Sequence, residues 1–324
     1  MNPKISIILP VYRVENFIEK CVRSLFCQTM VSEMEFIFID DKSPDGSIAI
    51  VEKLAQEFDI KKDQLKIIRH HENKGVSQSR QDGLEAASGE YIIHCDPDDW
   101  VETDMYEKLY VEARRGNFDM VICDYIEAGK EKINVKQDPK EYTSENIIKG
   151  ITDKSLYGST WNKLIRREIA QNYSFIPGIT VCEDALYLFN VLSISLKISY
   201  IEGHYYNYRV QNTQSVTKQY GSSAIDNDLK LFNELKKLGD KYPQLEPYAE
   251  QFAARHYIDR LYLYDSPWSR IKELRSYNHL LKKDVLHSRF HIYKTSLILN
   301  SPSMIGKLIR GIFLYHYKRR QNVK

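Results

Sequence analysis

Short apolar stretches alternate with amphipathic helical patterns over the first 125 residues, and this alternation constrains the fold more than any other feature. Each stretch is short enough for a strand, and apolar residues spaced three or four apart follow it, as on one face of a helix. The predicted strands are residues 5–9, 34–39, 65–69, 91–93 and 120–125. Such alternation favours right-handed βαβ units. We therefore predict an α/β, Rossmann-like domain with a mostly parallel sheet covered by helices.

Polar residues follow three of the predicted strands. Residues 12–13, 40–41 and 96–99 each come directly after an apolar stretch. In open parallel sheets, ligands bind in the crevice beyond the carboxyl ends of the strands. These three segments are therefore expected to converge on one binding crevice.

The most unusual of these segments holds three carboxylates within four residues, Asp96, Asp98 and Asp99. Like charges this close repel one another unless water or a cation separates them. Hard carboxylate oxygens at this spacing suit Mg²⁺ or Mn²⁺, which bind one or two protein carboxylates and take further oxygens from water and a diphosphate. Taken alone, the motif is equally consistent with an acidic turn in water.

The composition narrows the class of protein and its compartment. There are 46 basic and 44 acidic residues, so the chain as a whole has no general attraction for nucleic acid. Five cysteines without a C-x-x-C pair indicate reduced core residues rather than a disulfide framework or a zinc site. No basic-then-apolar leader and no apolar run of about 20 residues is present, so we expect a cytoplasmic protein.

The second half is less regular. Residues 127–150 carry many charges and are predicted to be an exposed excursion, whereas Glu183 and Asp184 begin a helix with an apolar face. Leu231, Leu235 and Leu238 form a helical stripe without a chemical motif. We therefore place a catalytic domain at 1–221 and a helical C-terminal extension at 222–324.

Three segments together resemble the family 2 glycosyltransferases with the GT-A fold. They are ISIILPVYRVENFIEKCVRSLFCQT, FIFIDDKSPDGS and NKGVSQSRQDGLEAASGEYIIHCDPDDW, in the order and spacing of that family. The resemblance covers about the first hundred residues and is that of bacterial polysaccharide-type enzymes. It implies a nucleotide-sugar site for a donor that is expected to be a UDP-sugar, with Mn²⁺ or Mg²⁺ as the cofactor.

The resemblance also implies roles for residues of the crevice. Pro10 and Tyr12 would lie beside the uracil, Asp41 would accept a hydrogen bond from the base, and Arg80 would lie nearby. An aromatic face suits stacking on a base, and a carboxylate suits the uracil N–H. Each has a structural alternative: a strand-end aromatic for Tyr12, a turn-stabilising role for Asp41 and a structural ion pair for Arg80.

Within the acidic motif, Asp98 resembles the direct metal ligand of the family. Asp96 would share the metal, and Asp96 or Asp99 would hold the ribose or a metal-bound water. Some relatives complete the metal shell with a histidine near the position of Gln211, and His204 is only a remote substitute for it.

Downstream motifs resemble the acceptor and leaving-group sides of the same family. Trp161, Asn162 and Lys163 match a segment near the acceptor, although a helix start with a packed Trp fits their composition equally well. The resemblance implies that Asp184 is the catalytic base and that Glu183 orients it or the acceptor. Acids in a first helical turn also occur for structural reasons alone.

Arg209, with Ser215, would contact the diphosphate through charge and hydroxyl donors. An exposed tyrosine-rich strand and turn is the alternative for this segment. The combined expectation is an inverting transferase that acts on a glycan or lipid-linked glycan acceptor. A metal-dependent phosphotransferase and a non-catalytic nucleotide-sugar-binding protein are the rival classes.

The last 24 residues, 301–324, contain six basic residues and no acidic one. Apolar residues from Ile305 to Phe313 repeat at helical spacing beside these charges. The pattern favours either a helix packed on the protein itself or peripheral docking on the anionic inner face of a membrane.

Overall fold

The computed structural model describes residues 3–210, 222–260 and Tyr277. The chain divides into two compact units, residues 1–214 and 215–324, which are considered separately below. The functional motifs named above lie in the first unit, apart from Ser215 and the C-terminal segment.

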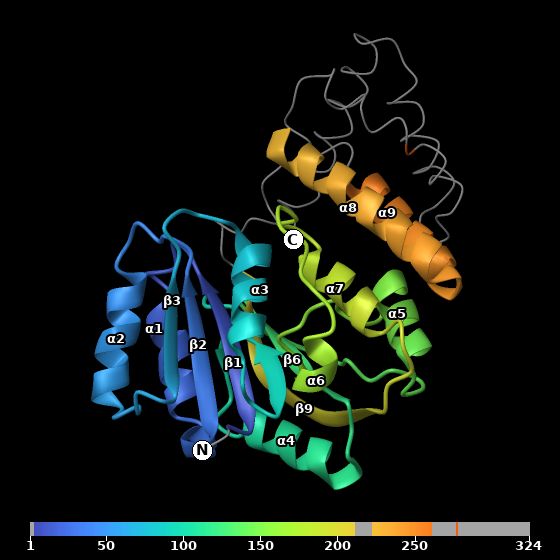
Figure 1. Cartoon of the computed structure of the whole chain (residues 1–324). Helices are drawn as coiled ribbons and strands as arrows, with labels where there is room; N and C mark the ends of the chain where they lie inside the picture. The colour runs from blue at the N-terminus through green and yellow to red at the C-terminus, as the bar shows by residue number, and fades with distance from the viewer. Residues whose placement is uncertain (1–2, 211–221, 261–276, 278–324) are drawn as a thin grey trace. The chain divides into compact units, whose positions relative to one another are not determined.

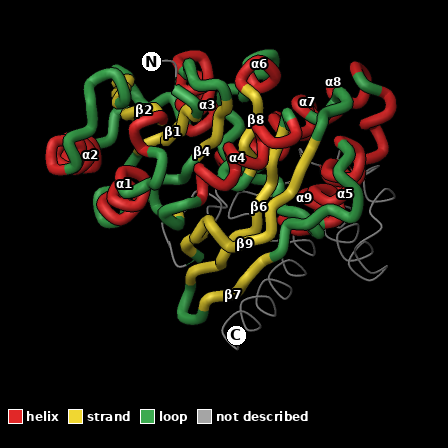
Figure 2. The backbone as a smooth tube through the Cα atoms, turned by 90° about the horizontal axis from the view of Figure 1, so that it is seen from below, coloured by secondary structure: helices red, strands yellow, loops and turns green. Residues whose placement is uncertain are grey.

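Four parallel strands form the first half of the sheet in the order β3-β2-β1-β4. They are β1 (Ile5–Val11), β2 (Met34–Asp40), β3 (Leu65–Arg69) and β4 (Tyr91–His94). The intervening helices are α1 (Ile18–Phe26), α2 (Ser47–Glu57) and α3 (Val76–Ala86), and Val31–Glu33 is a short 3₁₀ turn, η1. Figures 1 and 2 show α1 and α2 on one face of these strands and α3 on the other. The predicted βαβ arrangement is confirmed.

Burial on both faces explains the continuous apolar runs of the strands. Ile5, Ile7 and Leu9 of β1 belong to the core that α1 and α2 cover. Ile8 points to the opposite face, where a Cβ added to Gly83 of α3 would lie 2.4 Å from its Cγ2 atom. The absence of a side chain at Gly83 therefore lets α3 approach β1 closely.

The second half of the sheet is mixed rather than parallel. Its strands are β5 (Trp100–Val101), β6 (Met120–Ala128), β7 (Lys132–Val135), β8 (Lys163–Arg166) and β9 (Ile198–Arg209). β8 lies between β4 and β6 and is antiparallel to both, whereas β6 and β9 are parallel. β5 pairs antiparallel with β9, and Figure 2 shows β7, β6 and β9 side by side.

The helices of this half are α4 (Met105–Gly116), α5 (Ser144–Asp153), α6 (Arg167–Ala170) and α7 (Glu183–Val191). The predicted exposed excursion at 127–150 is correct for most of residues 130–143, which are exposed, but not for the part of α5 in this range, and the range also contains the end of β6 and all of β7. Ile147 and Ile148 are fully buried, and the Thr143 hydroxyl caps α5 by accepting a hydrogen bond from the Asn146 N–H. The apolar residues of α5 are few and are flanked by charged residues, so the sequence pattern did not reveal the buried face of this helix.

The described part of the second unit consists mainly of α8 (Ser222–Lys241), η3 (Pro243–Leu245) and α9 (Glu246–Arg260). Leu231, Leu235 and Leu238 are buried, as the predicted stripe requires. Of the described helices, none combines the length and apolar character needed to cross a bilayer. The predicted C-terminal helix at 301–313 lies outside the described residues.

Three of the five cysteines are buried, which fits reduced core residues. Cys182 is half-buried, and all five are free thiols. Cys27 is exposed just after α1, so the expectation of core cysteines is wrong for this residue.

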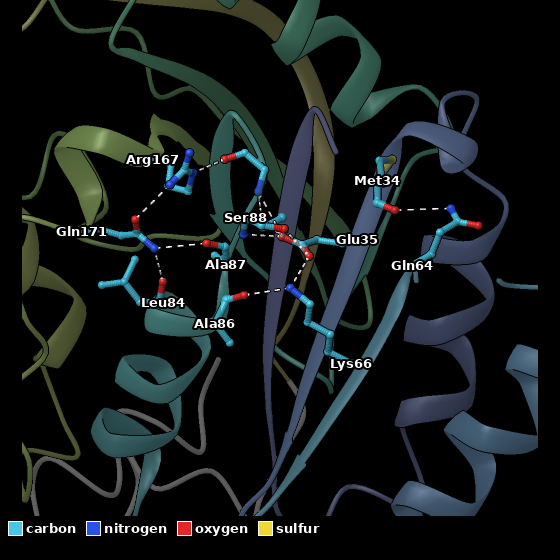
Figure 3. A network of polar contacts seen from close by, with 12 residues as sticks. Met34, Glu35, Gln64, Lys66, Leu84, Ala86, Ala87, Ser88, Arg167 and Gln171 are labelled. Carbon is cyan, nitrogen blue, oxygen red and sulfur yellow. Dashed lines mark hydrogen bonds and ion pairs between the residues drawn. The ribbon is translucent and has the colours of Figure 1, made fainter. Parts of the chain in front are cut away.

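A buried carboxylate fixes the turn that leads into β4 (Figure 3). One Glu35 oxygen accepts hydrogen bonds from the Ser6 hydroxyl at 2.5 Å and the Ser88 and Gly89 N–H groups at 2.6 and 3.0 Å. The other lies 2.7 Å from the Lys66 ammonium. Burial acts to raise the pKa of Glu35, but the hydrogen bonds from Lys66, Ser6 and Ser88 outweigh it and lower the pKa. The carboxylate is therefore the favoured form in the folded protein.

We expect Glu35→Gln to lower the free energy of unfolding at pH 7 by about 2 kcal/mol, because charge-assisted hydrogen bonds are lost. The folded-state pKa is the lower one, so this stabilisation is complete above the unfolded pKa of about 4.3. It is lost as the pH falls through the folded-state pKa, and the difference between wild type and variant should shrink in that direction. Urea unfolding at pH 7 and pH 3 measures both effects.

Glu52→Gln is the matched control, since Glu52 pairs with Arg69 at the surface and its side chain is 48% exposed. Equal losses of stability in the two variants would contradict the structural role of Glu35.

Candidate functional site

The carboxyl ends of β1, β2 and β4 lie at one edge of the sheet, as predicted. In the parallel register Val11 pairs with Asp40 and Ile8 with His94, which brings the segments after these strands together. Tyr12 is 38% exposed, and the Arg13 guanidinium lies 5.2 Å from its ring centroid. Pro10, near the end of β1, is half-buried beside them.

Asp41 is buried and organises the loop before α3. Its carboxylate accepts hydrogen bonds from the Lys74 N–H at 2.7 Å and the Gly75 N–H at 2.8 Å, and it contacts His70 Nδ1 at 2.7 Å. Gly75 has a φ of 86°, a conformation that favours glycine. Asp41 therefore shapes the rim of the crevice, and its contact with a base stays a prediction.

Arg80 connects two distant parts of the chain in the centre of the site. Its side chain is 4% exposed and projects from α3. It donates to Asp96 at 2.8 Å and to Glu183, and lies 3.3 Å from Asp184 Oδ1. One guanidinium thus brings the acidic motif after β4 into contact with the two acids that begin α7.

One cation does not balance three partly buried carboxylates, whose side chains are 25%, 11% and 13% exposed at Asp96, Glu183 and Asp184. Burial raises the pKa of Asp96 to about 7; Arg80 opposes this shift, and the charges of Asp184, Asp98 and Glu183 add to it. Burial also raises the pKa of Glu183, again against Arg80. The site therefore has the capacity to accept additional positive charge.

The acidic motif fits a divalent cation that binds few protein ligands. Asp96 and Asp98 offer hard oxygen donors two residues apart, at the half-exposed mouth of the crevice. Within the described residues, no cluster of three His, Cys, Asp or Glu side chains forms a closed metal site. Mg²⁺ and Mn²⁺ do not need one where a diphosphate supplies further oxygens.

Asp99 has a different environment from its two neighbours. It is 1% exposed, and its oxygens accept hydrogen bonds from the Tyr206 hydroxyl at 2.8 Å and the Arg209 N–H at 2.7 Å. These bonds join the motif to β9. Contact of Asp99 with ribose or water stays a prediction, and it would have to coexist with or replace these bonds.

Arg209 lies beside the acidic motif, as expected. Its Nε–H donates to the Asp98 carbonyl at 2.7 Å, and its guanidinium lies 5.0 Å from the Trp100 ring and 5.1 Å from the Phe17 ring. The sequence predicted no role for these two rings or for Tyr206; Phe17 comes from the start of α1, Trp100 directly follows the acidic motif, and the pairing of β5 with β9 brings Tyr206 to it. Ser215 and Gln211 lie outside the described residues, whereas His204 lies on β9.

Both carboxylate oxygens of Asp184 are constrained by neighbours. Its Oδ2 accepts a hydrogen bond from the Thr160 N–H at 3.2 Å. Oδ1 is buried and lies 3.3 Å from the Arg80 guanidinium, and among the described residues no donor hydrogen-bonds to it. The side chain as a whole is 13% exposed, so the orientation of this carboxylate is fixed and its access to solvent is small.

Trp161, Asn162 and Lys163 lie beneath the loop at 157–160 and are at most 2% exposed. The Lys163 ammonium donates to the Tyr157 and Ser159 carbonyls at 2.8 and 2.9 Å and to Asn162 Oδ1 at 2.8 Å. Burial lowers the pKa of Lys163 to about 7, against the charge of Asp184. Trp161 and Asn162 lie in the turn before β8 and Lys163 is its first residue, so the three do not start a helix, and they support the loop from below. Their place on an acceptor side stays a prediction.

The chain is similar in sequence to one protein family and to known relatives. The family model described as glycosyl transferase family 2 matches residues 6–174. The chain is 31% identical to the putative glycosyltransferase EpsH of Bacillus subtilis, over 77% of this chain and 73% of EpsH. It is 28% identical to the cholesterol galactosyltransferase of Borreliella burgdorferi, over 74% of this chain and 72% of that protein.

Among solved structures, residues 1–349 of TarS from S. aureus in complex with UDP-GlcNAc have a similar fold. The TM-score is 0.73 at 17% sequence identity, and the match covers 98% of this chain and 92% of that one. The likeness confirms the predicted GT-A fold.

Arg80→Met is expected to lower the free energy of unfolding by about 3 kcal/mol, because it leaves three partly buried acids without the buried cation between them. Thermal and urea unfolding at pH 7 measure the loss. Arg23→Met is the control, since Arg23 also binds two acids, Glu19 and Glu57, but on the surface of α1. A loss no larger than that of the control would exclude a central structural role for Arg80.

Proposed function

Because the chain belongs to glycosyltransferase family 2, we propose that it transfers a sugar from a UDP-sugar to an acceptor hydroxyl group with inversion at the anomeric carbon. The expected transfer is of the hexosyl type, with a glycan as the acceptor. Family membership establishes a glycosyltransferase and rules out the rival class of phosphotransferases. The donor, the acceptor and the stereochemistry belong to the proposal.

The contact of Arg80 with both acidic segments is the observation that carries this proposal. It brings the acidic motif after β4, the proposed donor side, to the start of α7, where the proposed base lies. An inverting transfer needs a base and a leaving group on opposite sides of one carbon. The short link through Arg80 supports this proposal, because it brings the two segments close together.

Asp184 is the proposed general base. It accepts the proton of the acceptor hydroxyl as that oxygen attacks the anomeric carbon, while the bond between this carbon and the diphosphate oxygen breaks. The Thr160 N–H on Oδ2 and the Arg80 guanidinium beside Oδ1 orient the carboxylate. Glu183 holds Arg80 and thereby keeps the base in place.

The diphosphate leaves on the side of the acidic motif. Arg209 lies there with its guanidinium between two aromatic rings and offers N–H groups to phosphate oxygens. Asp98 and Asp96 would hold Mn²⁺ or Mg²⁺, which when bound neutralises negative charge on the diphosphate. Tyr12 and Pro10 are assigned to the base of the nucleotide, with Asp41 at the rim.

The biological setting follows from the same proposal. We assign the reaction to cell-surface polysaccharide or glycan biosynthesis in the cytoplasm, with a glycan or lipid-linked glycan as acceptor. Peripheral membrane contact through residues 301–324 stays a prediction from sequence, since that segment lies outside the described residues. The domain boundary at 221/222 likewise stays a proposal.

A thermal-shift panel tests the donor. UDP with Mn²⁺ should raise the melting temperature, because a ligand that binds only the folded state stabilises it, whereas ADP and GDP should have little effect. Asp98→Asn should abolish the metal-dependent part of the shift, since it removes a charged oxygen from a site with few protein ligands. Asp104→Asn, at a surface pair with Lys108, is the matched control. If GDP alone raises the melting temperature, uracil is not the nucleobase that the site binds. If UDP with Mn²⁺ stabilises Asp98→Asn as much as wild type, Asp98 is not the metal ligand.

Asp184→Asn tests the base. We expect kcat to fall by about 10²-fold or more while the affinity for UDP changes less than about twofold, as loss of a general base predicts. Isothermal titration with UDP and a sugar-transfer assay measure the two quantities. Parallel loss of UDP binding would move Asp184 from catalysis to structure, and unchanged turnover would favour the non-catalytic alternative.

A further inference from the structure

An exposed tyrosine is held rigidly next to the proposed base. Tyr157 is 43% exposed, yet its N–H donates to Gln137 Oε1 at 2.7 Å and its carbonyl accepts from the Lys163 ammonium at 2.8 Å. Both partner side chains are buried, at 2% and 1% exposure. The backbone on either side of an exposed ring is therefore fixed from within the protein.

Other aromatic rings support this ring from below. The Tyr157 ring lies 5.8 Å from Tyr125, 5.7 Å from Trp161 and 6.1 Å from Tyr208, measured between centroids. Trp161 in turn stacks on Tyr206 at 4.1 Å with an interplanar angle of 12°. Packing of this kind restricts the rotamers of Tyr157, so a ligand that covers the ring loses little conformational entropy of the protein.

The loop that carries Tyr157 also orients the proposed base. Thr160, three residues further on, donates its N–H to Asp184. A Cβ added to Gly158 would lie 3.0 Å from the Cβ of Ala185, the residue after Asp184, so the loop packs directly on the start of α7. The loop that carries Tyr157 is therefore in direct contact with the segment that carries the proposed base.

The aromatic cluster also faces the donor side. Tyr206 and Arg209, which flank Tyr208 on β9, donate hydrogen bonds to Asp99 at 2.8 and 2.7 Å. Tyr208 is thus close to the acidic motif, whereas Tyr157 lies in the loop that binds Asp184. The two tyrosines lie between the two halves of the proposed site.

Resting on the function proposed above, we infer that Tyr157 is an acceptor subsite that stacks on the face of a pyranose ring, with Tyr208 at its edge. A pyranose presents C–H groups on its face and hydroxyl groups around its rim, which matches a fixed aromatic face bordered by a phenol. The inferred acceptor is therefore the terminal ring sugar of a glycan rather than an open-chain polyol phosphate.

The burial of the Lys163 ammonium supports a ring sugar over a polyol phosphate. A polyol phosphate carries a negative charge that a binding site would meet with an accessible cation. Lys163 lies beneath Tyr157, but it is 1% exposed and its three N–H groups bind the carbonyls of Tyr157 and Ser159 and the Asn162 amide. Its charge serves the loop and is not presented at the surface.

Saturation-transfer NMR on the full chain, with UDP and Mn²⁺ present, tests the subsite. The probes are methyl glycosides of glucose, galactose and N-acetylglucosamine, together with ribitol 5-phosphate. At least one glycoside should receive saturation from aromatic protons, and Tyr157→Ala should raise its dissociation constant about tenfold, the effect of one lost aromatic contact. Tyr157→Phe should retain binding, because the ring face is unchanged.

Two further variants control for side effects. Tyr157→Leu keeps apolar bulk without an aromatic face and should lose glycoside binding as Tyr157→Ala does, even if the alanine variant is unstable. Tyr142→Ala removes a tyrosine of similar exposure, 48%, outside the aromatic cluster and should bind as wild type does. Glycoside binding that Tyr157→Ala and Tyr157→Leu leave unchanged, binding of ribitol 5-phosphate alone, or binding of no probe would overturn the subsite.

Measuring UDP binding and glycoside binding separately distinguishes the proposed transferase function from the proposed Tyr157 subsite. Unchanged UDP binding with no effect of Tyr157 on glycosides would overturn the subsite and leave the transferase proposal in place. Tyr157-dependent glycoside binding without any UDP binding would support the subsite and contradict the assigned donor.

Discussion

The buried ion pairs of Arg80 are the interaction on which the site depends. A guanidinium on α3 contacts acids that follow β4 and acids that begin α7, so three separate elements meet at one side chain. Guanidinium suits this position because its planar array of N–H groups serves several carboxylates at once. The cost of burying so many charges is offset only where the contacts are complete. The geometry of the acids is therefore tied to the folding of the whole unit.

This arrangement leaves an excess of negative charge at the crevice. Asp96 and Glu183 both have raised pKa values because burial and neighbouring acids outweigh the attraction of Arg80. A site prepared in this way favours ligands that bring a cation with them, and a nucleotide diphosphate with Mn²⁺ or Mg²⁺ is such a ligand. The repulsion between these carboxylates is therefore also what would favour binding of the proposed metal-bound donor.

Aromatic residues on β9 and in the loop before β8 form the second organising element. Tyr206 hydrogen-bonds Asp99 and stacks on Trp161, so one strand holds the acidic motif and supports the loop at 157–160. The buried ammonium of Lys163 completes that support from below. The acidic motif and this loop are thus connected through packed side chains.

Local patterns in the sequence determined much of the fold and indicated the sheet edge at which the candidate site lies. Apolar runs such as Ile5–Leu9 predicted parallel strands because both faces of such strands are buried, and the acids after β4 indicated a ligand-binding edge. The same reasoning missed α5 in the charged segment 127–150, where Ile147 and Ile148 are buried.

Only the tertiary structure decided which residues meet across long separations in the chain. No local sequence pattern predicts that Arg80 contacts Glu183 or that Tyr206 hydrogen-bonds Asp99. Nor does one predict that Tyr157 stays exposed while its backbone is fixed. These features depend on the antiparallel insertion of β8 and on the pairing of β5 with β9. Periodicity records which face of an element is buried, whereas the partner of a buried charge or ring is set by how distant elements pack.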